Sequence, residues 1–214
     1  MTNRILLCTY EGEAYLEAQL ASMEGQTESN FRLLLSDDAS TDRSFAIGEA
    51  AAARDERITA IRRESGSGSA ARHFLEGLRD PRFFSAADES DYYLFSDQDD
   101  IWHPDKLAVE ARAMRCLEAR YGKALPLLVH CDMRVVDGTG REIAPSYVRY
   151  QKMSPARRRF RQLLVQNNVT GGAMLMNHAL VRLLVAHPVP EHAVMHDHWI
   201  ALVAAAFGRI AYLD

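Results

Sequence analysis

The sequence is organised as short apolar runs that alternate with helix-like segments. These mostly apolar runs lie at residues 5–8, 31–35, 58–61 and 92–95, and only Arg32 and Thr59 interrupt them. The segments between them carry apolar residues three and four positions apart, as at Leu16, Leu20 and Met23. An unbroken apolar run predicts a strand that is covered on both faces, and strand–helix alternation predicts a parallel sheet. The predicted fold class is therefore α/β, with a mostly parallel central sheet flanked by helices.

The pattern continues through the rest of the 214 residues without a linker or a repeat, which predicts one domain. We expect a helix from Pro104 to Tyr121, a strand at 127–131 and a hairpin turn at 135–140. Residues 145–155 are predicted to be irregular. The remaining expected elements are a strand at 173–176, a helix carrying Leu180, Leu183 and Leu184, a helix from His196 to Phe207 and a strand at 210–213.

Composition and charge exclude several classes of protein. The net charge of −4 gives no global basic field, so we predict no nucleic-acid partner. No apolar run approaches the ~18 residues of a membrane span, and the N-terminal run is too short for a signal peptide. Cys8, Cys116 and Cys131 are an odd number at wide spacing, which is typical of reduced thiols. These features predict a cytoplasmic protein.

The strand at 92–95 leads directly into Ser96-Asp97-Gln98-Asp99-Asp100. Ligand sites in open α/β sheets lie beyond the carboxyl ends of such strands. Crowded carboxylates raise each other's pKa unless a cation shares them, and Asp97 and Asp99 can point to one side of an extended chain. Such oxygen ligands suit Mg²⁺ or Mn²⁺ together with substrate phosphates. The alternative is a solvated acidic loop that caps the next helix.

Three further segments are open to two interpretations. Ser40 or Thr41 is predicted to cap a helix at 42–53, although the acids beside them could also bind a ligand. The glycine-rich turn at 64–69 could hold an anion at a helix N-terminus or be a plain loop, since it matches no nucleotide-binding pattern. The basic cluster at 157–161 could be a solvated helix face, or could contact acidic lipid headgroups or an anionic acceptor.

Six motifs in order resemble one family. They are Leu7–Gly12, Asp37–Asp42, Gly68–His73, Phe95–Trp102, Thr170–Gly172 and His196–Trp199. Together they resemble the family-2 glycosyltransferases of the GT-A fold, and the 96–102 motif is most similar to bacterial rhamnosyltransferase-like members. The resemblance covers nearly the whole chain. It implies a single GT-A catalytic domain over residues 1–214, with a nucleotide-sugar half at about 1–102 and an acceptor half at about 103–214, lacking later C-terminal segments of the family.

The resemblance also implies the donor-binding residues. A nucleotide sugar would be held by seven residues from four of the six motifs, namely Thr9, Tyr10, Glu11, Asp38, Arg72, Asp97 and Asp99. Asp38 would accept the N3–H of uracil or thymine, which implies a UDP- or dTDP-sugar. Asp99, with Asp97, would bind Mn²⁺ or Mg²⁺. His73 stands where the family has asparagine, and Arg72 could equally be an exposed helix arginine.

On the acceptor side, the resemblance implies Asp197 as the general base. Inverting transfer needs a carboxylate that takes the proton of the attacking hydroxyl. Asp197 could also be a helix N-cap. Acceptor contacts are implied for Asp100, Trp102, Gly171, Gly172, His198 and Trp199. His192, His196 and His198 suggest zinc as another possibility, but their spacing matches no named zinc motif.

The predicted function is metal-dependent, inverting transfer of a rhamnose-like sugar or a hexose from a dTDP- or UDP-sugar. The predicted acceptor is a glycan or lipid-linked glycan in cell-surface polysaccharide synthesis, with possible peripheral contact at the inner face of the membrane. One alternative is a non-catalytic sugar-nucleotide-binding module. Others are a sugar-phosphate nucleotidyltransferase, whose glycine-rich basic signature is absent at 9–12, and an aspartate phosphatase, whose threonine is absent after Asp99.

Overall fold

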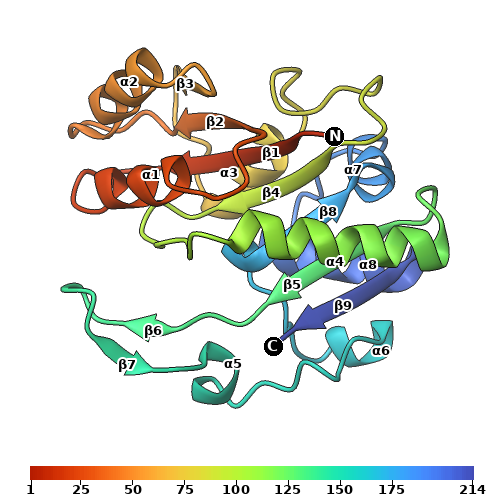
Figure 1. The fold of residues 1–214 in the computed structure, drawn as a ribbon. Helices are drawn as coiled ribbons and strands as arrows, with labels where there is room; N and C mark the ends of the chain where they lie inside the picture. Colours follow the sequence, from red (N-terminus) through yellow and green to blue (C-terminus); the bar gives the residue numbers. More distant parts are fainter.

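The computed structural model describes all residues from Met1 to Asp214 as a layered α/β structure (Figure 1). The strands are β1 (Asn3–Thr9), β2 (Phe31–Asp37), β3 (Ile58–Arg62), β4 (Tyr92–Ser96), β5 (Leu127–Cys131), β6 (Val135–Val136), β7 (Glu142–Ala144), β8 (Met174–Asn177) and β9 (Arg209–Leu213). The helices are α1 (Leu16–Glu24), α2 (Ser44–Arg54), α3 (Ala70–Gly77), α4 (Lys106–Tyr121), α5 (Tyr147–Tyr150), α6 (Phe160–Leu163), α7 (His178–Val185) and α8 (His196–Phe207), with a 3-10 turn, η1, at Gly171–Ala173.

Seven strands form the central sheet in the order β3-β2-β1-β4-β8-β5-β9. The pairs of β1 with β2 and β4, of β2 with β3, and of β5 with β9 are parallel. β8 runs antiparallel to both of its neighbours, β4 and β5. The predicted mostly parallel sheet is therefore confirmed, and β8 is the reversed strand within it.

Helices cover both faces of the sheet and bury two apolar cores. Alternate strand residues point to opposite faces, so Leu6 and Leu34 enter one core while Ile5 and Leu33 enter the other. The first core is closed by α3, α7 and α8, and the second by α1, α2 and α4 (Figure 1). The predicted runs at 5–8 and 92–95 are buried throughout for this reason, whereas β3 at the edge of the sheet is buried only at Ile58.

Two local expectations change. α2 begins at Ser44, whose backbone N–H donates to Asp42 Oδ1 at 2.9 Å, so the predicted capping role of Ser40 or Thr41 is wrong. Ser40 Oγ instead accepts from the backbone N–H of Glu11 at 3.1 Å, which ties the loop after β2 to the loop after β1. The stretch predicted as irregular at 145–155 contains the short helix α5.

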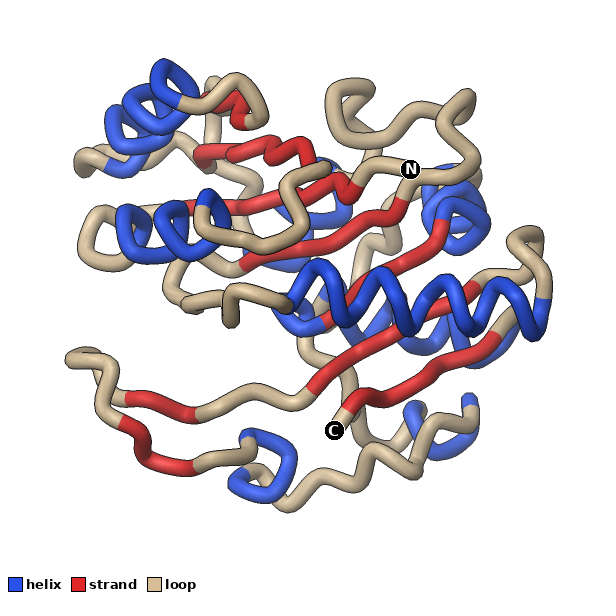
Figure 2. Tube along the Cα trace, in the orientation of Figure 1, coloured by secondary structure: helices blue, strands red, loops and turns tan.

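The hairpin predicted at 135–140 is present as the two-stranded β6–β7 ribbon, which extends away from the sheet (Figure 2). The three cysteines are unpaired. None of the helices has the length and apolar character needed to traverse a bilayer.

Candidate active site

A pocket of about 580 Å³ opens at the carboxyl ends of β1, β2 and β4. These strands are adjacent in the sheet, so residues distant in sequence share its walls. Of the predicted donor-binding residues, the structure brings Thr9, Tyr10, Asp38, Asp97 and Asp99 to this pocket. The position agrees with the rule that ligands bind beyond the strand ends of open α/β sheets.

Gln98 lines the pocket and holds the end of β1 in place, a role that the sequence patterns did not indicate. Its Oε1 accepts from Thr9 Oγ1 and from the backbone N–H of Tyr10, both at 2.8 Å. A Cβ on Gly12 would lie 2.4 Å from the same oxygen, so glycine is needed there for this contact. Gln98 lies between the carboxylates of the acidic motif, and its sequence context does not indicate that its amide contacts the end of β1.

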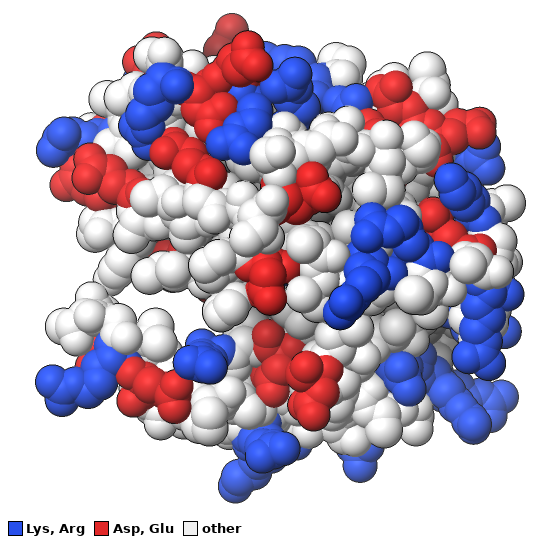
Figure 3. Space-filling view, in the orientation of Figure 1, with Lys and Arg blue, Asp and Glu red and all other residues white.

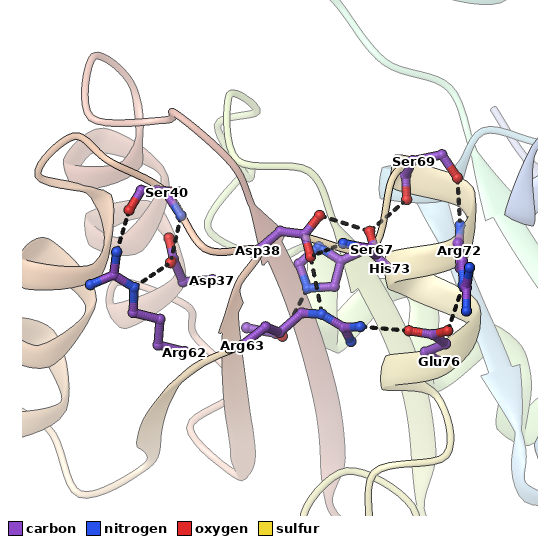
Figure 4. A network of polar contacts seen from close by, with 11 residues as sticks. Asp37, Asp38, Ser40, Arg62, Arg63, Ser67, Ser69, Arg72, His73 and Glu76 are labelled. Carbon is purple, nitrogen blue, oxygen red and sulfur yellow. Dashed lines mark hydrogen bonds and ion pairs between the residues drawn. The ribbon is translucent and has the colours of Figure 1, made fainter. Parts of the chain in front are cut away.

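Asp38 is held at the pocket wall by a network of polar contacts (Figure 4). Its Oδ1 accepts from the backbone N–H of Ser67 at 2.8 Å, and its Oδ2 accepts from Ser67 Oγ at 2.7 Å. Arg63 Nε lies 3.1 Å from Oδ1, and the same guanidinium pairs with Glu76 at 2.7 Å. Because a carboxylate oxygen can accept two hydrogen bonds, Oδ2 retains capacity for a ligand donor.

Arg72 and Glu11 lie away from the pocket lining. The Arg72 side chain is exposed and pairs with Glu76 at 2.7 Å, one helical turn along α3 (Figure 4). Glu11 Oε1 accepts from the backbone N–H of Thr41 at 2.8 Å and from its hydroxyl at 3.0 Å. In this conformation, both predicted donor-binding residues contact other parts of the protein.

His73, at the position where the family has asparagine, does line the pocket. Its Nε2 lies 2.8 Å from Ser36 Oγ, at the end of β2. Burial lowers the pKa of the imidazole, which favours the neutral ring. The histidine thus offers a neutral polar group beside Asp38.

Three carboxylates from two segments, the loop after β4 and helix α8, meet at Gly171 and Gly172. A Cβ on Gly172 would lie 2.4 Å from Asp100 Oδ2 and 3.2 Å from Asp97 Oδ2. On the other side, Asp197 Oδ2 accepts from the backbone N–H of Gly171 at 3.2 Å. Of the glycine pair predicted to be on the acceptor side, Gly172 therefore leaves the space that Asp97 and Asp100 occupy, and Gly171 donates its N–H to Asp197.

The gathered acids have perturbed pKa values. Burial, reinforced by Asp100, Asp99 and Asp197, raises the pKa of Asp97 to about 7. Burial and the charge of Asp99 raise the pKa of Asp100 to about 6. Burial also raises the pKa of Asp197, although hydrogen bonds from the His198 and Gly171 backbone oppose this effect. A cation at this place would lower the cost of keeping the acids ionised.

The donor set fits a hard divalent cation better than zinc. No group of three or more His, Cys, Asp and Glu side chains is assembled as a metal site. Asp97 and Asp99 line one pocket, and one or two carboxylates plus substrate phosphates are the usual ligands of protein-bound Mg²⁺. The zinc alternative requires a closed set of nitrogen or sulfur ligands, and the histidines do not supply one.

Asp197 lies in the first turn of α8, one residue beyond its start. The residue flanking the helix is Met195, so the interpretation of Asp197 as N-cap is wrong. Asp197 Oδ1 accepts from Asn167 Nδ2 at 3.0 Å. Asn167 therefore orients the candidate base, although nothing in its sequence context distinguished it from a turn residue.

His196 is buried beside this carboxylate. Its ring stacks on Phe74 with centroids 4.1 Å apart, and neither ring nitrogen has a hydrogen-bond partner. Burial lowers its pKa to about 4, so the ring is neutral at physiological pH. A Cβ on Gly171 would lie 2.4 Å from its Nε2, which makes the histidine part of the wall behind the glycine pair.

Three predicted acceptor residues are placed elsewhere. Trp102 is only 4% exposed and packs in the core beneath the sheet, with Lys106 Nζ 4.8 Å from its ring centroid. The Nε2 of His198 lies 2.7 Å from the Leu163 carbonyl oxygen. Trp199 lines a separate apolar pocket of about 330 Å³ between α7 and α8. These three residues are close in sequence to residues of the site, but their side chains point into the core or toward other helices.

Comparison with known proteins identifies the class. The family model described as "Glycosyl transferase family 2" matches residues 4–183. The chain therefore belongs to glycosyl transferase family 2, in agreement with the resemblance carried by its six motifs.

Two proteins of known sequence are similar to part of this chain. The chain is 33% identical over 112 residues to a protein of Shigella flexneri described as dTDP-rhamnosyl transferase RfbG, covering 52% of this chain and 36% of the relative. It is 31% identical over 110 residues to an uncharacterized glycosyltransferase of Haemophilus influenzae, covering 51% of this chain and 41% of the relative. Each match spans about half of the chain and a smaller share of the relative.

Solved structures of GT-A glycosyltransferases share the fold. Residues 1–349 of S. aureus TarS in complex with UDP superpose with a TM-score of 0.68 at 20% identity, covering all of this chain and 58% of that 1–349 chain. The mannosyltransferase PcManGT from Pyrobaculum calidifontis, in complex with GDP-Man and Mn²⁺, gives a TM-score of 0.66 at 17% identity, covering 99% of this chain and 54% of that one. At these identities the similarity shows the fold alone.

Proposed function

We propose that this domain transfers a sugar from a dTDP- or UDP-activated donor to a glycan acceptor, with inversion and with a divalent metal. The observation that carries the proposal is the meeting of Asp97, Asp100 and Asp197 at the glycine pair, beside the pocket lined by Asp38 and Asp99. A nucleotide site and a candidate base on opposite sides of one small space are what direct transfer between donor and acceptor needs.

The pocket residues support a pyrimidine nucleotide. Asp38 Oδ2 has one protein partner and can accept the N3–H that uracil and thymine present between two carbonyl groups. Cytosine has an acceptor at that position, so the same carboxylate would repel it. Similarity to a dTDP-rhamnosyl transferase supports dTDP-rhamnose as the first donor to test.

Asp99 and Asp97 would hold Mn²⁺ or Mg²⁺ against the diphosphate. A bound divalent cation would stabilise the charge that develops on the departing nucleoside diphosphate. The chain's own contribution is a half-buried, oxygen-lined wall in which the pKa of Asp97 is raised to about 7 and the pKa of Asp100 to about 6. Such acids need a cation or a proton to be stable where they lie.

Asp197 is the general base in this proposal. Its carboxylate would take the proton of the acceptor hydroxyl while that oxygen forms a bond to the anomeric carbon. On the opposite face, the bond from the anomeric carbon to the phosphate oxygen breaks, and dTDP or UDP leaves. Asn167 and the Gly171 N–H orient this carboxylate, and its raised pKa favours proton uptake.

Comparison of Asp197→Asn with Asp99→Ala tests these assignments, with release of dTDP or UDP from the sugar donor as the activity readout. Asp197→Asn should keep donor binding and lose activity by about 10²–10⁴-fold, because only the proton acceptor is removed. Asp99→Ala should instead lose the metal-dependent part of donor binding. Full activity of Asp197→Asn would exclude this residue as the base, and unchanged metal dependence in Asp99→Ala would exclude the metal role.

A nucleotide-binding module without turnover is the second candidate. The orientation of Arg72 and Glu11 away from the pocket favours it, because two predicted donor contacts are not formed in this conformation. Metal-dependent nucleotide binding by the wild-type chain, without nucleoside diphosphate release from any tested sugar donor, would support this candidate.

A further inference from the structure

A long stretch of the chain carries only positive charge. From Ile143 to Pro190 there is no Asp or Glu, but there are seven Lys and Arg residues, in a protein whose net charge is −4. All seven are exposed, and six of them lie between residues 149 and 161. They are Arg149, Lys152, Arg157, Arg158, Arg159 and Arg161. None of the six forms an ion pair, so their charges are available to a partner.

Large apolar side chains are exposed among these cations. Tyr150 is 55% exposed, Phe160 41%, Leu164 56% and Val165 87%. Helix α6 buries only Leu163 against the body of the protein. We refer to residues 149–165 as the basic apolar surface. In the space-filling view, Lys and Arg side chains lie along the lower edge of the molecule, where Figure 1 places α5, α6 and the loop between them (Figure 3).

The combination of features matches a bilayer surface better than a soluble polyanion. Anionic lipid headgroups attract each nearby Lys or Arg by about 1 kcal/mol, and apolar side chains beside them can enter the interface. Nucleic acid would neutralise the arginines but would leave Leu164 and Val165 in water. We propose that the basic apolar surface docks this protein on a membrane that contains anionic lipids.

Hydrogen bonds link this surface to the segments that hold the candidate base, Asp197. Asn168 Nδ2 donates to the Arg157 carbonyl oxygen at 3.1 Å, and the neighbouring Asn167 donates to Asp197 at 3.0 Å. The His198 ring also contacts the Leu163 carbonyl oxygen at 2.7 Å. Docking would therefore bring the Asp197 side of the site close to the bilayer. The consequence that the acceptor is carried on a lipid rests on the proposed function, whereas the docking itself does not.

Vesicle co-sedimentation tests the docking. The probes are vesicles of phosphatidylcholine alone and vesicles in which a third of the lipid is phosphatidylglycerol. The wild-type protein should bind the second kind, bind the first at least about tenfold more weakly, and lose binding as salt is raised. A short single-stranded RNA serves as a soluble polyanion in the same assay.

Two sets of substitutions separate the charge from the apolar contribution. The triple change Arg157→Gln, Arg159→Gln and Arg161→Gln should weaken binding to anionic vesicles by at least about tenfold. The pair Leu164→Ser and Val165→Ser should weaken it while leaving the salt dependence in place. The matched control is Arg32→Gln, Arg112→Gln and Arg115→Gln, which removes three exposed positive charges from other elements and should leave vesicle binding within about twofold of wild type.

Three results would overturn the proposal. They are equal binding to both kinds of vesicle or to neither, equal loss in the control triple, and binding of RNA but not of anionic vesicles. Nucleotide titration of the same variants is the independent readout, because the substituted side chains lie outside the pocket. Retained nucleotide binding with lost vesicle binding supports docking, and failure of nucleotide binding in the wild type would count against the proposed function alone.

Discussion

At Gly172, a Cβ would lie 2.4 Å from Asp100 Oδ2 and 3.2 Å from Asp97 Oδ2. The first of these distances is shorter than any non-bonded contact that a Cβ makes in a folded protein. The carboxylates occupy the volume that any other residue would need. At the residue scale, the site therefore depends on the absence of a side chain at Gly172 as well as on the acids that fill the space.

Gly172→Ala should consequently push Asp100 and Asp97 out of their places. We expect metal-dependent nucleotide binding to weaken by at least about tenfold, because repositioning a packed group costs about 1–3 kcal/mol. Isothermal titration of UDP with and without Mn²⁺ measures the effect. Gly138→Ala is the control, since a Cβ there meets nothing within 4 Å. Equal affinities for wild type and Gly172→Ala would show that the acids do not bind the metal.

Gln98 gives a second prediction at this scale. Gln98→Ala removes the acceptor shared by Thr9 Oγ1 and the Tyr10 backbone N–H. Each lost hydrogen bond contributes about 1 kcal/mol, so nucleotide affinity should fall by about tenfold as the loop after β1 loosens. Gln151→Ala, at an exposed position without a side-chain hydrogen bond, should leave affinity unchanged. Similar nucleotide affinity in both variants would show that Gln98 does not contribute to nucleotide binding.

At the scale of elements, the edge of the sheet depends on a close backbone approach. β9 pairs in parallel with β5, and the Arg209 N–H donates to the Pro126 carbonyl oxygen at 3.0 Å. A Cβ on Gly208 would lie 1.7 Å from that oxygen. Because the colliding atom is backbone, the clash can be relieved only by moving β9 away from β5.

Gly208→Ala should therefore lower the free energy of unfolding by at least about 2 kcal/mol, at the upper end of the usual cost of overpacking. Urea denaturation followed by circular dichroism measures the change. Gly25→Ala, where the nearest heavy atom to the new Cβ is 3.4 Å away, is the matched control and should cost much less. Equal stability of the two variants would mean that β9 is not held in the described register.

The strands and long helices were predictable because their signals are local. The apolar run at 92–95 became β4, the strand predicted at 127–131 became β5, and the periodic segment ending at Tyr121 became α4. The orientation of β8 was not predictable, because residues 174–177 have the same apolar character as a parallel strand. Its direction is seen only in the antiparallel pairing with β4 and β5, which are distant in sequence and which no local pattern describes.

The site was predictable as a set of acids but not as a set of orientations. Asp38, Asp97 and Asp99 were expected at strand ends and do line one pocket. Trp102, His198 and Trp199 belong to the same motifs, yet they project into the core or toward other helices. Gln98 and Asn167 act through hydrogen bonds to residues 30 or more positions away, which no local pattern indicates.

At the scale of the whole molecule, buried histidines couple stability to pH. His130 on β5 is 1% exposed, and its Nε2 has no hydrogen-bond partner. Burial, together with Arg158 and against the opposing effect of Asp132, lowers its pKa to about 4 from an ordinary value of 6.5. Tyr212 on β9 packs with its ring centroid 5.2 Å away.

Because the pKa of His130 is lower in the folded state than in the unfolded state, the unfolded chain binds a proton first as the pH falls. The stabilisation is complete above about pH 6.5 and is lost between pH 6.5 and 4, by an amount on the order of 3 kcal/mol. His130→Leu should therefore show a smaller loss of unfolding free energy between pH 7 and 4.5 than the wild type. The exposed His192→Leu is the control, and identical pH slopes in all three proteins would contradict a buried, neutral His130.

The central claim concerns the whole molecule, namely that the pocket and the acids beside it form a metal-dependent site for a pyrimidine nucleoside diphosphate. The most direct test is calorimetric titration of UDP, dTDP and ADP into the protein, each with Mn²⁺ and with EDTA. The account predicts binding of UDP or dTDP that requires Mn²⁺ and is lost in Asp99→Ala, with much weaker binding of ADP because adenine lacks the N3–H for Asp38. Equal binding of all three nucleotides, or pyrimidine binding that is unchanged in EDTA, would contradict it.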